Sequence, residues 1–98
     1  MKKPLFICNQ GENRSKTAAN IFNGEYAGIY SEKQPVTKDL LEEASELIVF
    51  EDNHIKWIAK NYPKYYLKHK ITNLDIPDIY NYNNEKLIKE LKTKVKIK

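Results

Sequence analysis

The chain has 98 residues, of which 41% are hydrophobic and 31% charged, and its formal net charge is +4. This length fits one globular domain, so we expect residues 1–98 to form a single domain. The apolar stretch after the basic N-terminus covers only residues 5–8. It is shorter than the roughly 7–15 residues of a signal-peptide core and the roughly 20 residues of a membrane span, which favours a cytoplasmic protein without membrane contact.

Cysteine and histidine are scarce. The single cysteine, Cys8, excludes an internal disulfide. Together with the two distant histidines, His54 and His69, it gives no recognisable zinc spacing, so we expect neither a metal nor a cofactor. We interpret both histidines as surface or helix-capping residues rather than as catalytic bases.

The basic residues are spread along the chain apart from a lysine-rich tail at 92–98, so we do not expect a nucleic-acid surface. Their chemistry is more informative than their number. Among 17 Lys and Arg residues the only arginine is Arg14, six residues after Cys8. A guanidinium forms a planar fork that grips an oxyanion with two parallel hydrogen bonds, which an ammonium cannot do. Position 14 is therefore predicted to bind an oxyanion.

Short apolar runs alternate with stretches of helical periodicity. In the first half of the chain we predict a strand at 5–8, a helix at 15–23 stopped by Gly24, a strand at 28–31, and a helix opened by Pro35 and Thr37 and running to Ala44. Residues 46–50 form the clearest buried strand.

The second half continues the alternation. Asp52 or Asn53 is predicted to cap a helix that Pro63 ends, and residues 71–74 form a fourth strand. A last helix follows its cap, Asn84. Its inward-facing residues are predicted to be Leu87, Ile88, Leu91 and Val95.

This order predicts an α/β fold: a single three-layer domain with a four-stranded parallel sheet and helices on both faces. Ligands of such sheets bind beyond the carboxyl ends of the strands, where the strand order switches. Cys8 stands at the carboxyl end of the first predicted strand.

The segment from Cys8 to Ser15 connects that strand to the first predicted helix. Its backbone N–H groups lack helical partners and, if they point inward, form a nest for an anion that the helix dipole reinforces. Gly11 supplies a permissive backbone, and asparagine tolerates unusual dihedral angles. We therefore expect a phosphate-binding loop. Its members are Asn9, Gln10, Gly11, Glu12, Asn13 and Ser15.

The same field favours the thiolate form of Cys8, the nucleophilic form of cysteine. Arg14 is expected to clamp two oxygens of the transition state, and the Ser15 hydroxyl to donate a hydrogen bond to the sulfur. The loop thus combines a nucleophile, an oxyanion site and a clamp.

The pattern C-x5-R-S after an N-terminal strand resembles the low-molecular-weight protein tyrosine phosphatases. Ser31 and the strand leading to Glu51 resemble further segments of that family, and residues 75–80 (DIPDIY) are similar to its D-V-P-D-P-Y loop. The resemblance covers nearly the whole chain. It departs at Gly11, where the family usually has an asparagine tied to the serine represented by Ser31, and at Glu12, which puts a carboxylate beside the anion site.

The resemblance implies a phosphomonoester hydrolase, a protein tyrosine phosphatase that works through a cysteinyl-phosphate. The general acid it implies is Asp78, with Asp75 as the competing candidate. Tyr80 and Tyr82 are candidates to pack against a substrate ring, and the expected partner is a phosphorylated protein or a small phosphomonoester.

Three alternatives stay open. Glu12 suits a cationic phosphoramidate, which would make the protein a phosphoarginine phosphatase. The departures at Gly11 and Glu12 are also compatible with a phosphate- or phosphoprotein-binding module that turns over weakly. Arsenate reduction would require an external thiol, because Cys8 is the only cysteine. The oligomeric state does not follow from the sequence.

Overall fold

Helices and strands alternate along the computed structural model, which describes residues 2–95. The strands are β1 (Lys3–Cys8), β2 (Glu25–Gly28), β3 (Ala44–Val49) and β4 (Ile71–Asn73). The helices are α1 (Arg14–Phe22), α2 (Lys38–Glu43), α3 (Asp52–Asn61), α4 (Pro63–Lys68) and α5 (Glu85–Lys94). Within these residues, no helix is long and apolar enough to cross a membrane.

The sheet confirms the predicted α/β architecture. Its strands lie in the order β2-β1-β3-β4, and each neighbouring pair is parallel. The chain leaves β1 for β2 on one side and later returns to place β3 on the other, so the strand order switches between β1 and β3. The crevice beyond the carboxyl ends of these two strands is therefore where such a fold binds ligands.

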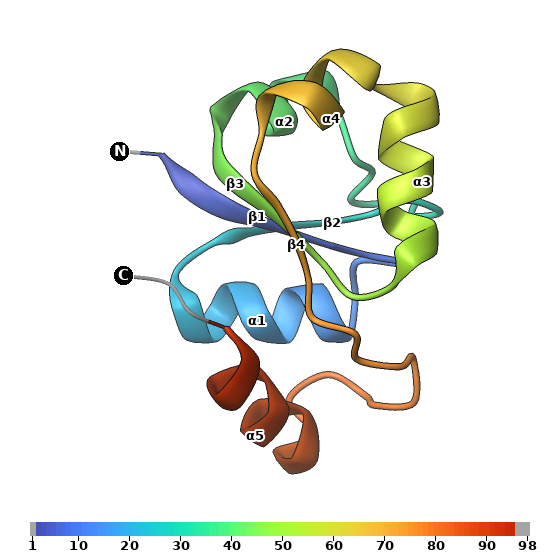
Figure 1. Ribbon diagram of the computed structural model, residues 1–98. Helices are drawn as coiled ribbons and strands as arrows, with labels where there is room; N and C mark the ends of the chain where they lie inside the picture. Colours follow the sequence, from blue (N-terminus) through green and yellow to red (C-terminus); the bar gives the residue numbers. More distant parts are fainter. Residues whose placement is uncertain (1, 96–98) are drawn as a thin grey trace.

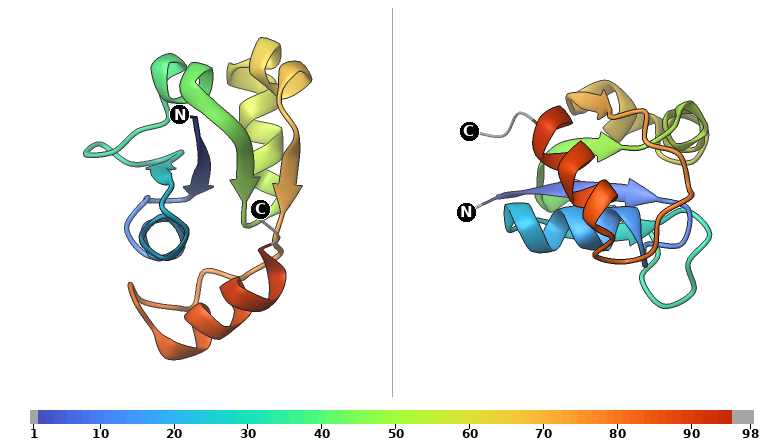
Figure 2. Two further views of the ribbon diagram at one scale, coloured as in Figure 1. Left: turned by 90° about the vertical axis from the view of Figure 1, so that its left-hand side faces the viewer. Right: turned by 90° about the horizontal axis from the view of Figure 1, so that it is seen from below.

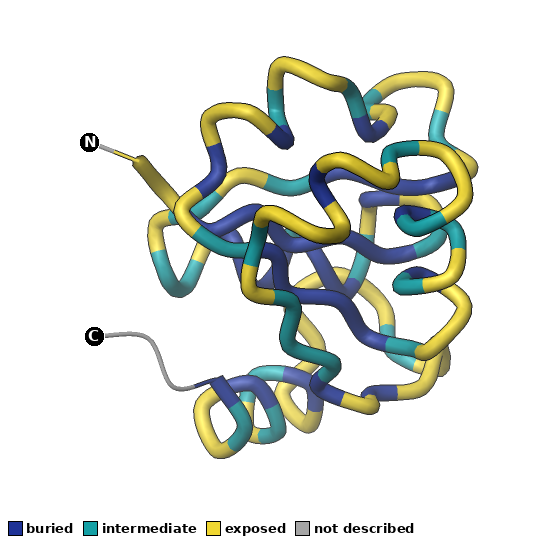
Figure 3. The backbone as a smooth tube through the Cα atoms, turned by 45° about the horizontal axis from the view of Figure 1, so that its top comes forward, coloured by how far each residue is buried: buried dark blue, intermediate teal, exposed yellow. Residues whose placement is uncertain are grey.

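Helices cover both faces of the sheet: α1 and α5 lie below it in Figure 1, and on the other face α2 and α4 lie at the top and α3 at the right. Alternation along β1 explains the two layers, because successive side chains of a strand point to opposite faces. Leu5 and Ile7 pack with residues of α2, α3 and α4, whereas Phe6 and Cys8 pack with residues of α1 and α5. The buried stretches run through the centre of the molecule in Figure 3. Cys8 thus ends a strand that is buried on both faces.

Two of the predicted helix caps are confirmed. The Thr37 hydroxyl accepts a hydrogen bond from the N–H of Leu40, and the Asn84 side chain accepts from the N–H groups of Lys86 and Leu87. The cap of α3 differs from the prediction: Glu51 caps it, and both predicted caps lie inside the helix. The reason is a reciprocal pair of hydrogen bonds between Glu51 and His54, the third residue of the helix. A prediction that considers only Asp and Asn as caps overlooks this arrangement.

The second strand lies earlier than predicted, at Glu25–Gly28 rather than 28–31. Its register pairs Leu5 with Glu25 and Cys8 with Gly28, so the ladder ends where β1 ends. The N–H groups of Ile29 and Tyr30 instead donate to the carbonyls of Cys8 and Asn9. Residues 29–30 therefore line the loop after β1.

Three further boundaries differ from the prediction. Ala44 opens β3 rather than ending α2. Asn23, not Gly24, takes the left-handed conformation that ends α1, with φ 54°. Pro63 ends α3 as predicted but also begins α4, because the fixed φ and missing N–H of proline suit the first position of a helix.

Two glycines bring the loop after β1 against the end of β2. Gly11 has φ 71°, the left-handed region expected for it, and a Cβ there would lie 2.8 Å from the nitrogen of Gly28. A Cβ on Gly28 would lie 2.3 Å from the carbonyl carbon of Gln10 and 2.5 Å from the nitrogen of Gly11. Only residues without side chains allow these two backbones to approach so closely.

We predict that Gly28→Ala lowers the free energy of unfolding by about 1–3 kcal/mol, the usual cost of overpacking, and displaces the loop. Urea denaturation measures the first effect, and the chemical shift of the Gly11 amide reports the second. Gly24→Ala is the matched control. Its Cβ would meet Phe6 and Pro4 at the other end of β2, so it should destabilise the protein but leave that amide in place. A Gly28→Ala protein with an unmoved Gly11 amide would contradict the packing argument.

Candidate active site

The thiol of Cys8 is held by the two neighbours that the loop supplies. The side chain is 3% exposed, and its Sγ lies 3.0 Å from Oγ of Ser15, the contact expected from the sequence. The N–H of Gly11 also donates to Sγ, at 3.2 Å. The Gly11 N–H and the Ser15 hydroxyl thus fix the position of the sulfur.

Arg14 is completely buried, at 0% exposure, in the first turn of α1. Its Nη1 donates to Oε2 of Glu51 at 2.6 Å and to the carbonyl of Ile76 at 2.8 Å. The guanidinium carbon also lies 5.6 Å from the centre of the Phe50 ring. One end of the guanidinium is therefore fixed by an ion pair and a carbonyl, and an aromatic side chain lies against its central carbon.

The opposite edge of the same guanidinium is unused. Nε and Nη2 are buried and donate to no atom of residues 2–95. An unpaired buried donor costs free energy, so these two N–H groups are available to a ligand. The N–H groups on this edge are parallel, the arrangement that grips two oxygens of one phosphate.

The other residues of the predicted loop differ in their burial and in their hydrogen bonds. Asn13 precedes α1, but its side chain does not cap the helix, so the N–H groups of the first turn are not satisfied by that residue. Asn9 is half-buried and hydrogen bonded through its side chain, whereas Gln10 and Glu12 are exposed. Of these six loop residues, Gly11 alone has positive φ.

The two candidate aspartates occupy different places. Asp78 lies beside the loop: its Oδ1 is 3.8 Å from Nε of Arg14, and its Oδ2 accepts from Nδ2 of Asn9 at 3.3 Å. Asp75 has φ 56°, its N–H donates to Asn73, and its carbonyl accepts from Lys94. Of the two, the structure thus brings Asp78 to Arg14. The loop from β4 to α5, which carries both aspartates, passes the carboxyl ends of the strands in the right-hand view of Figure 2.

The two tyrosines of this segment also separate. Tyr80 packs against the hydrophobic cluster that the sheet forms with α1 and α5. Tyr82 lies at the loop instead, where its ring is 4.8 Å from Nζ of Lys16. With Gly11, Glu12, Tyr26 and other residues it lines a cavity of about 380 Å³.

Sequence reasoning missed two residues of the site, Glu51 and His54. The sequence indicates only that a strand resembling a family segment leads to Glu51, yet this carboxylate binds Arg14. The signal that points to it is its position directly after β3, beside the switch in strand order, where a buried arginine requires an opposite charge. His54 is 0% exposed and caps α3 from within, so it is a capping histidine but not a surface one.

His54 is held in its neutral form. Its Nδ1 accepts from the N–H groups of Phe50 and Glu51, at 3.2 and 3.1 Å, so this nitrogen carries no proton. Burial, and then the positive charge of Arg14, lower the pKa of His54 to about 4. His69 is more exposed than His54, and its Nε2 is hydrogen bonded to the carbonyl of Leu41.

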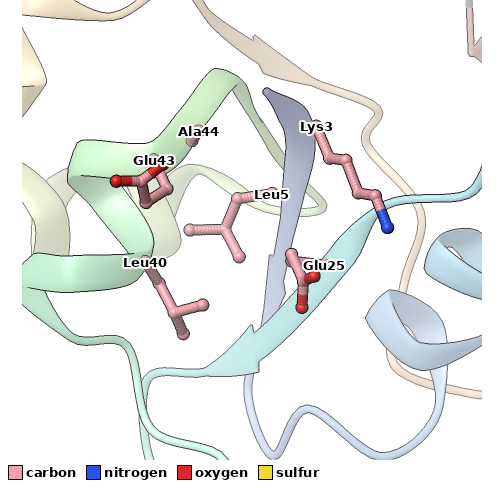
Figure 4. Close-up of a pocket in the computed structure, with 6 residues that line it drawn as sticks. All are labelled: Lys3, Leu5, Glu25, Leu40, Glu43 and Ala44. Carbon is pink, nitrogen blue, oxygen red and sulfur yellow. The ribbon is translucent and has the colours of Figure 1, made fainter. Parts of the chain in front are cut away.

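A second cavity, of about 200 Å³, lies at the opposite edge of the sheet (Figure 4). Lys3, Glu25 and Ala44, which line it, each begin a strand, so it is remote from the carboxyl ends where Cys8 lies. Within residues 2–95, no three His, Cys, Asp or Glu side chains come together as a metal site.

Comparison with solved structures identifies the fold. The chain is similar to the YwlE arginine phosphatase from Geobacillus stearothermophilus, with a TM-score of 0.74 and 17% identity over 95% of this chain and 85% of that one. It is also similar to the tyrosine phosphatase AmsI of Erwinia amylovora (TM-score 0.71, 17% identity, 95% and 88% covered). Wzb of Vibrio vulnificus, solved with benzylphosphonate, gives a TM-score of 0.69 and 19% identity over 93% of this chain and 90% of that one.

These likenesses confirm the fold expected from the resemblance to low-molecular-weight protein tyrosine phosphatases. No family model matches the chain, and no curated protein sequence matches it.

The depressed pKa of His54 predicts a pH-dependent stability. Between pH 6.5 and pH 4 a histidine in the unfolded chain becomes protonated, whereas folded His54 stays neutral. The free energy of unfolding therefore falls as the pH falls through this window. His54→Asn, which retains an acceptor for the backbone N–H groups, should lack this dependence. Urea denaturation should show the stability difference between wild type and variant shrinking by about 3 kcal/mol from pH 7 to pH 4. A difference that does not vary with pH would contradict the neutral, buried state.

Proposed function

We propose that this protein hydrolyses phosphate monoesters through a cysteinyl-phosphate intermediate, and that phosphotyrosine is its preferred substrate class. One observation carries the proposal: two buried donors of Arg14 lack a hydrogen-bond partner among residues 2–95, in a site that also holds a thiol fixed by two hydrogen bonds. The shared fold of known phosphatases supports it.

In the first step the Cys8 sulfur attacks phosphorus, forming the S–P bond as the P–O bond to the leaving group breaks. Nε and Nη2 of Arg14 bind two oxygens of the phosphoryl group, and because Nη1 is already fixed, the guanidinium reorganises little during the reaction. Protonated Asp78 gives its proton to the departing oxygen.

In the second step water attacks the phosphorus of the cysteinyl-phosphate. Asp78, now a carboxylate, takes a proton from that water as the new P–O bond forms and the S–P bond breaks. The electron pair returns to sulfur, where Ser15 and the Gly11 N–H stabilise the thiolate. Phosphate leaves, and Asp78 is again protonated.

The cavity beside the loop supports an aryl phosphate. Tyr26 and Tyr82 line it and offer aromatic surface to a substrate ring. Glu12 lines it as well, with Lys16 and Lys33. The two ammonium groups offset the attraction of that carboxylate for a cationic leaving group.

A phosphoarginine phosphatase is the second candidate, favoured by Glu12 and by the fold shared with an arginine phosphatase. Phosphate release from phosphotyrosine, phosphoarginine and phosphoserine compounds separates the candidates, and we expect the highest kcat/KM with phosphotyrosine. If phosphoarginine is turned over faster than phosphotyrosine, and Glu12→Gln abolishes that turnover, the phosphoarginine assignment replaces the first one. A module that only binds would hold phosphate yet release none from any of the three.

We also propose a cytoplasmic location, because a nucleophilic thiol persists in a reducing compartment. The partner would be a phosphorylated protein or a small phosphomonoester.

The assignment of the acid predicts a dependence on the leaving group. Asp78→Asn should reduce turnover of phenyl phosphate on the order of a hundredfold or more, since the phenolate oxygen requires a proton to depart. Turnover of 2,4-dinitrophenyl phosphate, whose leaving group departs unprotonated, should change little. Asp75→Asn, the matched control from the same loop, should change the turnover of both substrates by the same factor. If the selective loss follows Asp75→Asn instead, the two roles are exchanged.

A further inference from the structure

Both ring nitrogens of His54 are engaged, and together they define its tautomer. Since Nδ1 accepts two backbone N–H groups, the single ring proton of the neutral imidazole is on Nε2. That nitrogen lies 2.8 Å from Oδ1 of Asn9, to which it donates. His54 therefore presents a donor, in a fixed direction, to the first residue of the loop after Cys8.

The donor on His54 determines which way the Asn9 amide faces. Because Oδ1 of Asn9 accepts from His54, its NH2 group must point to the other side. There Nδ2 donates to Oδ2 of Asp78 at 3.3 Å. Reversing the amide would place an NH2 group against the N–H of His54 and an oxygen against a carboxylate, so the orientation is specified at both ends.

Asp78 depends on this contact because little else fixes it. Its side chain is 46% exposed, and it lies in the irregular segment between β4 and α5. Its other oxygen, Oδ1, is 3.8 Å from Nε of Arg14, on the edge where the oxyanion is expected. The two oxygens therefore have different neighbours: a neutral donor for Oδ2 and the substrate site for Oδ1.

We propose that His54 and Asn9 are positioning residues, a hydrogen-bonded relay from the backbone of Phe50 and Glu51 to the carboxyl of Asp78. This inference rests on the proposed function, in which Asp78 is the acid. With the Asn9 N–H directed at Oδ2, the acidic proton is carried on Oδ1, next to the leaving oxygen. His54 and Asn9 orient the carboxyl group of Asp78 and exchange no proton with the substrate.

Asn9→Ala tests the relay with the least disturbance, since the side chain is half-buried and its hydrogen bonds are those to His54 and Asp78. We expect turnover of phenyl phosphate to fall on the order of tenfold, less than removal of the acid itself, and turnover of 2,4-dinitrophenyl phosphate to fall by a clearly smaller factor. Asn61→Ala is the control: it removes a surface asparagine that bonds Trp57 within α3 and should affect neither substrate.

A double-mutant cycle separates positioning from a general effect on the loop. In an Asp78→Asn background, Asn9→Ala should cause no further loss on phenyl phosphate, because the acid it positions is gone. Equal losses on the two substrates, or an undiminished loss in the Asp78→Asn background, would overturn the relay while leaving the hydrolase intact. Failure of wild type to release phosphate from either ester would instead overturn the proposed function, and the relay with it.

The tautomer provides a readout that does not depend on turnover. Long-range ¹H–¹⁵N spectra of the folded protein should show His54 with its proton on Nε2 throughout pH 5.5–8, a range well above its pKa of about 4. A proton on Nδ1, or a ring that titrates within that range, would overturn the relay whatever the activity.

Discussion

The arrangement of this molecule depends on how Arg14 is held. One end of its guanidinium is bound by Glu51 and by the carbonyl of Ile76, and the other end is buried without a hydrogen-bond partner among residues 2–95. These contacts join α1 to the segments that follow β3 and β4, so the carboxyl edge of the sheet converges on a single side chain. A buried cation with an unused edge is costly in an empty site and well matched to an anionic ligand. The fold thus holds two donors of Arg14 free of hydrogen-bond partners among residues 2–95.

Around Arg14, the loop backbone positions the sulfur of Cys8, and side chains from other segments position the carboxyl group of Asp78. Gly11 and Gly28 allow the loop to pass directly against β2, which brings an N–H to the sulfur of Cys8. Asp78 comes from the far end of the chain on an irregular segment and is connected to rigid structure through Asn9 and His54. Cys8, the proposed nucleophile, is fixed by its own strand and loop, whereas Asp78, the proposed acid, is fixed by residues from elsewhere.

Much of this could be predicted from the sequence, because the signals are local. The alternation of apolar runs gave the parallel sheet, and the spacing of Cys8, Arg14 and Ser15 gave the loop. The second strand was misplaced because residues 25–28 and 28–31 are both short and partly apolar, and only pairing with β1 decides between them. Glu51 and His54 were undervalued for a similar reason. Their partners, Arg14 and Asn9, are 37 and 45 residues away in the chain, and no local pattern encodes such contacts.

The central claim is that the unused edge of Arg14 is the oxyanion site. The most direct measurement is a crystal structure of the protein with orthovanadate, a mimic of the phosphoryl group in transfer. The account predicts vanadium bonded to Sγ of Cys8, two vanadate oxygens on Nε and Nη2 of Arg14, and Nη1 still on Glu51 and Ile76. Vanadate bound elsewhere, or an Arg14 that leaves Glu51 to reach it, would contradict the account.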